Sequence, residues 1–149
     1  MADNCIFCKL ANGEIPTRTL YEDNDFRIIL DTNPLTYGHA LILPKKHAEN
    51  LFALDEETVG KAHQLARQFG AKMMDILKAD GMNILQNNGL AAGQSVFHFH
   101  IHLIPRYKED KVTLGMESKS ESKYDLDALV KEFENKAAAI PPALDSGLR

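Results

Sequence analysis

Short runs of β-branched and aromatic residues alternate with turn residues over the first part of the chain. Residues 20–22 and 26–30 are two such runs, and the Asp23-Asn24-Asp25 segment between them is typical of a turn. The two runs therefore predict a β-hairpin. A third run, residues 39–43, predicts another strand, which Pro44 ends.

The pattern then changes to helical spacing. Asp55 can cap a helix that runs to about Ala79, and Gly81 is expected to end it. Apolar side chains at this spacing share one face of the helix, so we expect them in the core. They are Val59, Ala62, Ala66, Phe69, Met73, Ile76 and Leu77.

The last third of the chain predicts two strands and one helix. Strands at 82–86 and 96–104 are separated by the loop 87–93, which is rich in residues that tolerate unusual backbone angles. Residues 107–122 are charged and rich in serine and lysine, which predicts a mobile excursion. A second helix is expected over residues 125–139. Its apolar stripe consists of Leu126, Leu129, Val130 and Phe133.

This order of elements predicts an α+β fold in a single domain, residues 1–140, followed by a flexible tail, residues 141–149. About five strands are expected, and they should be antiparallel because several connections are short. A long central helix and a C-terminal helix complete the fold. The length of 149 residues suits one domain.

Composition and charge narrow the functional class. The hydrophobic fraction of 44% and the charged fraction of 26% are ordinary for a globular protein. The net charge is −4, and no basic block exceeds Lys45-Lys46, which argues against nucleic-acid and membrane-surface partners. The chain has no apolar run of the roughly 18 residues that a membrane span needs, and no signal-peptide pattern. We therefore expect a cytoplasmic protein.

The two cysteines, Cys5 and Cys8, are three positions apart. This spacing allows three interpretations: half of a zinc site, a redox pair, or two unrelated thiols. A structural disulfide is unusual in a reducing cytosol. A redox pair usually follows a strand, and the segment before Cys5 is too short to form one. The spacing alone favours metal ligands but leaves the other interpretations open.

The most informative segment is an alternating row of three histidines, His98, His100 and His102. On a strand, alternate side chains share a face, so the imidazoles would stand about 6.5–7 Å apart along one surface. Such a row cannot by itself close a tetrahedral metal site. A chance pattern or a solvated polar face is the alternative interpretation. The residues expected on the opposite face are Phe97, Phe99, Ile101 and Leu103.

The segment 98–104, His-Phe-His-Ile-His-Leu-Ile, resembles the His-x-His-x-His-x-x signature of the histidine triad (HIT) family. The resemblance covers roughly residues 4–107 and is closest to the bacterial form of the nucleoside phosphoramidase (Hint) branch. It implies a small α+β domain whose sheet continues across a twofold homodimer. Further matching segments are Cys5-Ile6-Phe7, Ile15-Pro16, Tyr21-Glu22-Asp23, Gly38-His39, Leu43-Pro44-Lys45-Lys46-His47 and Gly93-Gln94-Ser95-Val96.

The resemblance implies a hydrolase that cleaves purine nucleoside phosphoramidates at the α-phosphate without a catalytic cofactor. A histidine attacks the phosphate, and water then cleaves the nucleotidyl-histidine to release a nucleoside monophosphate; imidazole suits this role near neutral pH. By the match, His100 is the nucleophile and His102 contacts the phosphate and the leaving group. His98 orients the site, and His39 supports the triad. A dinucleoside polyphosphate hydrolase, suggested by residues 103–106, and a non-catalytic nucleotide-binding or interaction protein are the alternatives.

The match also implies a nucleotide pocket. Asp31 would accept hydrogen bonds from both ribose hydroxyls, since hydrogen bonds to a charged acceptor are the stronger ones. The other implied substrate-binding residues are Ile6, Phe7, Leu10, Phe26, Thr32, Asn87, Gly89, Gln94 and Ser95. Core packing is the alternative role for Phe7 and Phe26, and turn formation is the alternative for Asp31, Asn87 and Gly89.

Finally, the resemblance implies two further metal ligands beside the two cysteines. In many bacterial members two histidines join such a pair, and His47 and His98 occupy the corresponding positions. Two cysteines and two histidines form a closed tetrahedral set, which predicts one structural zinc ion per chain. The ion would tie the N-terminal segment to the sheet and fix His98 beside the nucleophile.

Overall fold

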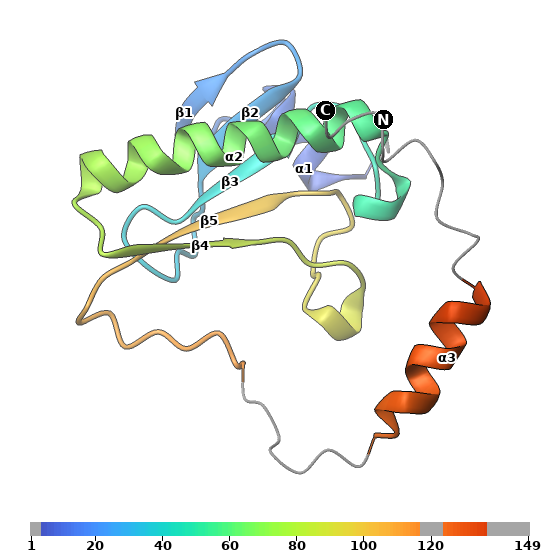
Figure 1. Ribbon diagram of the computed structural model, residues 1–149. Coiled ribbons are helices and arrows are strands. Elements are labelled where there is room, and N and C mark those ends of the chain that lie inside the picture. Colours follow the sequence, from blue (N-terminus) through green and yellow to red (C-terminus); the bar gives the residue numbers. More distant parts are fainter. Residues whose placement is uncertain (1–3, 117–123, 137–149) are drawn as a thin grey trace. The chain divides into compact units, whose positions relative to one another are not determined.

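The computed structural model describes residues 4–116 and 124–136 (Figure 1). The chain divides into two compact units, and the boundary between them falls between Val112 and Thr113. The predicted end of the domain at residue 140 and the predicted tail, residues 141–149, lie outside the described residues.

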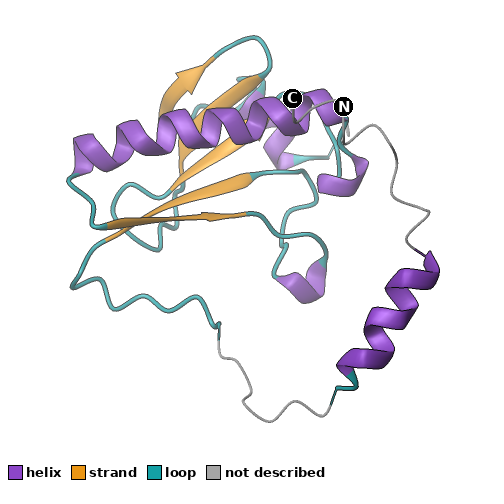
Figure 2. Cartoon of the chain, in the orientation of Figure 1, coloured by secondary structure: helices purple, strands orange, loops and turns teal. Residues whose placement is uncertain are grey.

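The first unit is built on a five-stranded antiparallel sheet with the strand order β1-β2-β3-β5-β4 (Figure 2). The strands are β1 (Thr19–Glu22), β2 (Phe26–Leu30), β3 (Ala40–Pro44), β4 (Gly81–Leu85) and β5 (Ile101–Arg106). The predicted α+β fold with five antiparallel strands is confirmed, and so is the hairpin of β1 and β2.

A long helix, α2 (Glu56–Leu77), lies across one face of the sheet (Figure 1). The Asp55 carboxylate caps it by accepting a hydrogen bond from the Thr58 N–H at 3.0 Å, as predicted. The predicted stop at Gly81 is wrong. Lys78 adopts the left-handed conformation (φ 53°) and closes the helix through its own N–H, whereas Gly81 begins β4.

The sheet separates two apolar clusters. Ile28 and Ile42 are cross-strand partners on the α2 face, whereas the neighbouring partners Ile29 and Leu41 point to the other face. That second face is covered by a short helix, α1 (Ile6–Ala11). The cluster under α2 also includes Ala62, Ala66, Met73, Phe99, Ile101 and Leu103.

Most of the predicted stripe of α2 faces the core. Ala62, Ala66 and Met73 are buried, but Ile76 is 65% exposed, so its predicted core position is wrong. Ile76 lies in the last turns of the helix and borders a mostly apolar cavity of about 550 Å³.

The strand that carries the histidines begins later than predicted. β5 starts at Ile101, because the last pair of its ladder with β3 is Ile42 with Ile101. Further along β3, Pro44 has no N–H to donate, and the Phe99 N–H donates instead to the Ala48 carbonyl oxygen at 2.7 Å. His98 and His100 therefore precede the strand. Phe97, expected on the core face, is 42% exposed, whereas Phe99, Ile101 and Leu103 join the core under α2 as predicted. A 3-10 turn, η2 (Leu90–Ala92), precedes this segment.

The described part of the second unit contains one helix, α3 (Leu126–Lys136). The predicted residues 137–139 of this helix lie outside the described residues. Within the described helices, none is both long enough and apolar enough to cross a membrane. The apolar stripe of α3 is exposed, at 60% for Leu126, 48% for Leu129, 55% for Val130 and 71% for Phe133.

Candidate functional site

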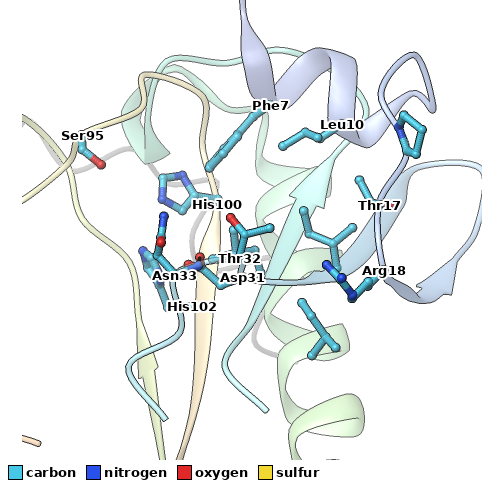
Figure 3. Close-up of a pocket in the computed structure, with 14 residues that line it drawn as sticks. Phe7, Leu10, Thr17, Arg18, Asp31, Thr32, Asn33, Ser95, His100 and His102 are labelled. Carbon is cyan, nitrogen blue, oxygen red and sulfur yellow. Dashed lines mark hydrogen bonds between the residues drawn. The ribbon is translucent and has the colours of Figure 1, made fainter. Parts of the chain in front are cut away.

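A cavity of about 660 Å³ opens on the α1 face of the sheet (Figure 3). Phe7 and Leu10 of α1 line it together with the apolar side chains of Ile29 and Leu41. Polar side chains from the end of β2 and from the histidine segment complete its wall. A cavity of this size that combines apolar walls with convergent polar groups suits a small-molecule ligand.

Seven predicted site residues meet in this cavity: Phe7, Leu10, Asp31, Thr32, Ser95, His100 and His102. Seven other lining residues were not predicted: Pro16, Thr17, Arg18, Ile29, Leu30, Asn33 and Leu41. Strand alternation could have identified Ile29 and Leu41, because cross-strand partners point to the same face.

Other predicted residues do not line this cavity. Phe26 is 2% exposed and packs under α2, because it shares a strand face with Ile28 rather than with Ile29. Its role is core packing. Ile6 is 46% exposed on α1, and Asn87 lies in the loop beside Gly93.

Gln94 is buried and holds this loop rather than facing the cavity. Its side-chain oxygen accepts a hydrogen bond from the Gly89 N–H at 2.8 Å. Its amide nitrogen donates to the carbonyl oxygens of Glu49 at 2.7 Å and Val96 at 3.1 Å. Gly89 has a φ of 91°, a conformation that favours glycine. Both predicted substrate contacts, Gln94 and Gly89, therefore have structural partners in the loop.

His100 is 6% exposed and has one imidazole nitrogen fixed by the backbone. Its Nδ1 lies 2.7 Å from the His98 carbonyl oxygen, which can only accept, so Nδ1 carries the proton. Burial lowers the pKa of His100. The neutral ring then has its lone pair on Nε2, and the Phe7 ring packs edge-on against it, with the ring centroids 4.8 Å apart. This is the tautomer that a nucleophile at Nε2 requires.

His39 and His102 form a second ordered pair. The Leu35 N–H donates to His39 Nδ1 at 3.0 Å, so the proton of the neutral His39 ring resides on Nε2. That Nε2 lies 3.0 Å from His102 Nδ1 and donates to it. The neutral His102 ring consequently carries its proton on Nε2. Burial is the main cause that lowers the pKa of His39 and brings the pKa of His102 to about 4.

Asp31 follows β2 and is partly exposed at the cavity wall. Its Oδ1 accepts a hydrogen bond from the Asn33 N–H at 2.8 Å, which fixes the carboxylate in a turn. Its Oδ2 lies 3.7 Å from His39 Nε2. The carboxylate therefore presents a charged acceptor to the cavity close to the His39–His102 pair.

The four predicted metal ligands, Cys5, Cys8, His47 and His98, converge. Their ligand atoms all lie within 4.8 Å of one another. Cys8 Sγ is 3.3 Å from His47 Nδ1, and His47 Nδ1 is 3.2 Å from His98 Nδ1. Neighbouring ligands of a tetrahedral zinc ion stand roughly 3.3 to 3.8 Å apart, given its usual bond lengths. The described residues fit such an ion.

Protonation also suits a metal at this cluster. His98 Nε2 donates to the Pro44 carbonyl oxygen at 2.8 Å, so its Nδ1 faces the sulfur atoms with a free lone pair. Burial lowers the pKa of His98 to about 4, which keeps this ring neutral. The Cys5 sulfur also accepts a hydrogen bond from the Cys8 N–H at 3.3 Å and caps α1.

A second cluster has enough ligand atoms for a metal but the wrong tautomer. Asp31, His39 and His102 also bring their ligand atoms within 4.8 Å of one another. However, His39 Nδ1 is occupied by the Leu35 N–H, so its Nε2 carries a proton and has no lone pair to share. This cluster suits proton positioning, whereas the cysteine cluster suits a metal.

The sheet, the long helix and the histidines around β5 define a histidine triad protein. The chain belongs to the HIT family, because its residues 12–109 match the sequence profile described as "HIT domain". The solved structure of a HIT family protein from Bacillus anthracis is 35% identical, with a TM-score of 0.84, and the match covers 95% of this chain and 100% of that one.

Two other relatives bear on the site. A Zn-bound histidine triad family protein from Mycobacterium smegmatis is 33% identical, with a TM-score of 0.70, over 92% of this chain and 98% of that one. Adenylylsulfatase HINT3 of Arabidopsis thaliana is 42% identical over 110 residues, which is 74% of this chain and 56% of that protein.

Proposed function

We propose that the chain is a nucleotide hydrolase of the bacterial Hint-like branch that cleaves purine nucleoside phosphoramidates at the α-phosphate. The hydrogen bond from His100 Nδ1 to the His98 carbonyl oxygen carries the proposal. It leaves an unprotonated Nε2 on a buried, neutral imidazole that borders a cavity of nucleotide size.

The reaction has two steps. In the first, His100 Nε2 forms a bond to the α-phosphorus while the bond from phosphorus to the amine nitrogen breaks. His102 Nε2–H donates the proton that the departing amine needs, and the His39 bond at 3.0 Å holds the ring for this transfer. In the second step, water attacks phosphorus, returns a proton to His102, and releases the nucleoside monophosphate and free His100.

The nucleoside would occupy the rest of the cavity. Its base would lie between α1 and the sheet, against Phe7, Leu10 and Ile29. The ribose hydroxyls would donate to Asp31, whose turn hydrogen bond from the Asn33 N–H holds the carboxylate in place. Ser95 borders the cavity beside His100, where it can contact the phosphate or the leaving atom.

One zinc ion per chain, held by Cys5, Cys8, His47 and His98, would be structural. Cys5, Cys8, His47 and His98 would close a tetrahedral site and leave no open position for the substrate, so a bound ion would tie α1 to the sheet. The chemistry described above uses protein groups and water alone. A Zn-bound relative supports the assignment.

The candidate substrates differ in the leaving group on the α-phosphate. A relative named an adenylylsulfatase makes an anhydride at the α-phosphate a second candidate substrate, and a dinucleoside polyphosphate is a third. The same nucleophile serves each of them, because the bond to His100 forms at the same phosphorus. A nucleotide-binding protein without turnover would use the same cavity but would need no tautomer control at His100.

The experiment compares turnover of adenosine 5′-phosphoramidate, adenylyl sulfate and diadenosine tetraphosphate by the purified protein. His100→Ala removes the nucleophile, and His63→Ala is the matched control, since His63 is exposed on α2, where its Nδ1 lies 3.0 Å from the Val59 carbonyl oxygen. We expect the phosphoramidate to be the best substrate. Turnover of none of the three, or equal turnover by His100→Ala, would overturn the proposal.

We also propose a cytoplasmic homodimer with no nucleic-acid or membrane partner. Cysteine ligands of a metal must stay reduced, and the convergence of Cys5 and Cys8 on one metal cluster therefore suits a reducing compartment. The sheet ends at β4, whose outer edge is available to a second copy.

A further inference from the structure

Arg18 lines the cavity at the end away from the histidines. In Figure 3, Asp31 and Thr32 lie between Arg18 and His100. If the phosphate sits at His100 and the ribose at Asp31, as the proposed function requires, the remaining end holds the nucleobase. Arg18 and its neighbour Thr17 are then the polar side chains beside the base.

The guanidinium of Arg18 has no internal partner within residues 4–116 and 124–136. No carboxylate there lies within 4.0 Å of it, although Arg27 and Arg106 both form ion pairs. The backbone of Arg18 is nevertheless fixed, because its carbonyl oxygen accepts a hydrogen bond from the Leu30 N–H at 2.9 Å. A positioned residue with a free set of donors therefore borders the place where the base would lie.

An arginine side chain recognises a base only by donating hydrogen bonds to it. Its fork of N–H groups matches two adjacent acceptors, and a 6-oxopurine offers such a pair in O6 and N7. Adenine carries an amino group at the same position, so one of the two hydrogen bonds is lost and a donor faces a donor. Thr17 does not decide the preference, because its hydroxyl, which pairs with Thr19 at 2.6 Å, is a group that can donate or accept and so suits either base.

We propose that Arg18 is a specificity-determining residue that makes the cavity prefer 6-oxopurine nucleotides, such as GMP and IMP, over AMP. The inference rests on the proposed function for the orientation of the nucleotide. It concerns binding, so it can be measured without turnover.

The simplest competing role for Arg18 is general attraction of an anionic nucleotide. That role would strengthen binding of every nucleotide equally, because the charge acts through space and not through the base edge. Lysine keeps the charge but lacks the planar fork, so Arg18→Lys separates the two roles. Arg67→Ala is the matched control, since Arg67 is an exposed arginine of α2 that lines none of the described cavities.

The experiment measures dissociation constants of GMP, IMP and AMP by isothermal titration calorimetry on the full chain. We expect wild type and Arg67→Ala to bind GMP and IMP about 5- to 10-fold more tightly than AMP, the lower part of the range for a bidentate contact because Arg18 is exposed. Arg18→Lys should keep the affinity for AMP and weaken the preference, because lysine can reach the same acceptors but lacks the planar fork. Arg18→Ala should lose the preference.

Equal affinity of the wild type for IMP and AMP would overturn the inference, and so would a preference that survives in Arg18→Lys and Arg18→Ala. Tight GMP binding with IMP as weak as AMP would overturn it too, since the 2-amino group would then be the group recognised. Binding of none of the three would overturn it together with the nucleotide cavity. An Arg18-dependent preference without phosphoramidate turnover would support this inference while the proposed function fails.

Discussion

His100 donates a hydrogen bond from Nδ1 to the backbone carbonyl oxygen of His98 at 2.7 Å, while the His98 side chain turns away into the cysteine cluster. One residue therefore contributes its side chain to the candidate metal site and its backbone to the candidate nucleophile. His98 Nε2 is held in turn by the Pro44 carbonyl oxygen at 2.8 Å. Through these contacts, the end of β3 positions both sites.

The first prediction is that His100→Ala loses turnover and keeps nucleotide binding. No neighbouring side chain can replace Nε2, because the His102 ring is bonded to His39 and carries its proton on Nε2. The loss in kcat should be on the order of 1000-fold or more. A nucleotidyl adduct trapped by rapid acid quench in the wild type, and absent from the variant, would identify the covalent step.

A second prediction concerns His102 and the leaving group. His102→Ala should lower kcat on the order of 100-fold for a phosphoramidate, because an amine leaves poorly without a proton. The loss should be much smaller for adenylyl sulfate, since sulfate is a good leaving group and needs no proton. Steady-state kinetics on both substrates test this difference. Equal losses would mean that His102 positions the phosphate rather than donating the proton.

A third prediction is that the metal stabilises the fold. Elemental analysis should find one zinc ion per chain, and Cys5→Ser should lose it, because the closed site needs four ligands. Chelation should lower Tm, and each kcal/mol lost should lower it by roughly 2–4 °C in a domain of about 150 residues.

The control for the metal is Ser95→Ala, which changes a cavity residue but none of the four ligands. It should keep both the zinc ion and the Tm of the wild type. A metal-free wild type prepared without chelators, with Cys5 and Cys8 equally reactive toward a thiol reagent, would instead indicate two unrelated thiols.

A fourth prediction concerns the pH dependence of stability, to which the buried pair His39 and His102 contributes. Burial holds the pKa of His102 at about 4 in the folded chain, below its ordinary value of 6.5, and lowers that of His39 as well. The unfolded chain therefore binds more protons between these values, so the free energy of unfolding falls as pH decreases from 6.5 towards 4. Urea titrations at several pH values should give a shallower fall for His102→Gln, which cannot titrate. An identical fall in this variant would assign the acid sensitivity to other groups.

Hydrophobic periodicity could predict the elements that depend on local sequence. The apolar stripe of α2 is a repeated pattern, and the Asp55 cap involves residues that are close in sequence. Both can therefore be recognised from the sequence alone. The start of β5 differs from the prediction because the alternation of residues 96–104 begins before the ladder with β3 does, and that ladder ends at the pair Ile42 and Ile101. The end of the ladder depends on which strand lies alongside, which the local sequence does not contain.

The candidate site shows the same limit. His100, His102 and Asp31 were predicted to share one cavity, and they line it. Gln94 was assigned to the substrate because of its position in the signature, yet its amide donates to Glu49, 45 residues earlier in the chain. Arg18 was missed because nothing next to it in sequence marks the far end of a cavity.

The last prediction is a homodimer formed through β4. Among residues 4–116 and 124–136 this strand pairs only with β5, so its outer edge has no strand partner in that part of one copy of the chain. Ile84 on this strand is 50% exposed, and an apolar edge strand is a template for pairing with a second copy. Sedimentation equilibrium at micromolar concentration should give the dimer mass, and Ile84→Lys should shift the equilibrium to monomer, since a lysine blocks edge pairing.

Leu20→Lys is the matched control, because Leu20 is 42% exposed on β1 at the opposite edge and should leave the dimer intact. A monomeric wild type would contradict the homodimer. A dimer that is lost only in Leu20→Lys would place the interface at β1 instead of β4.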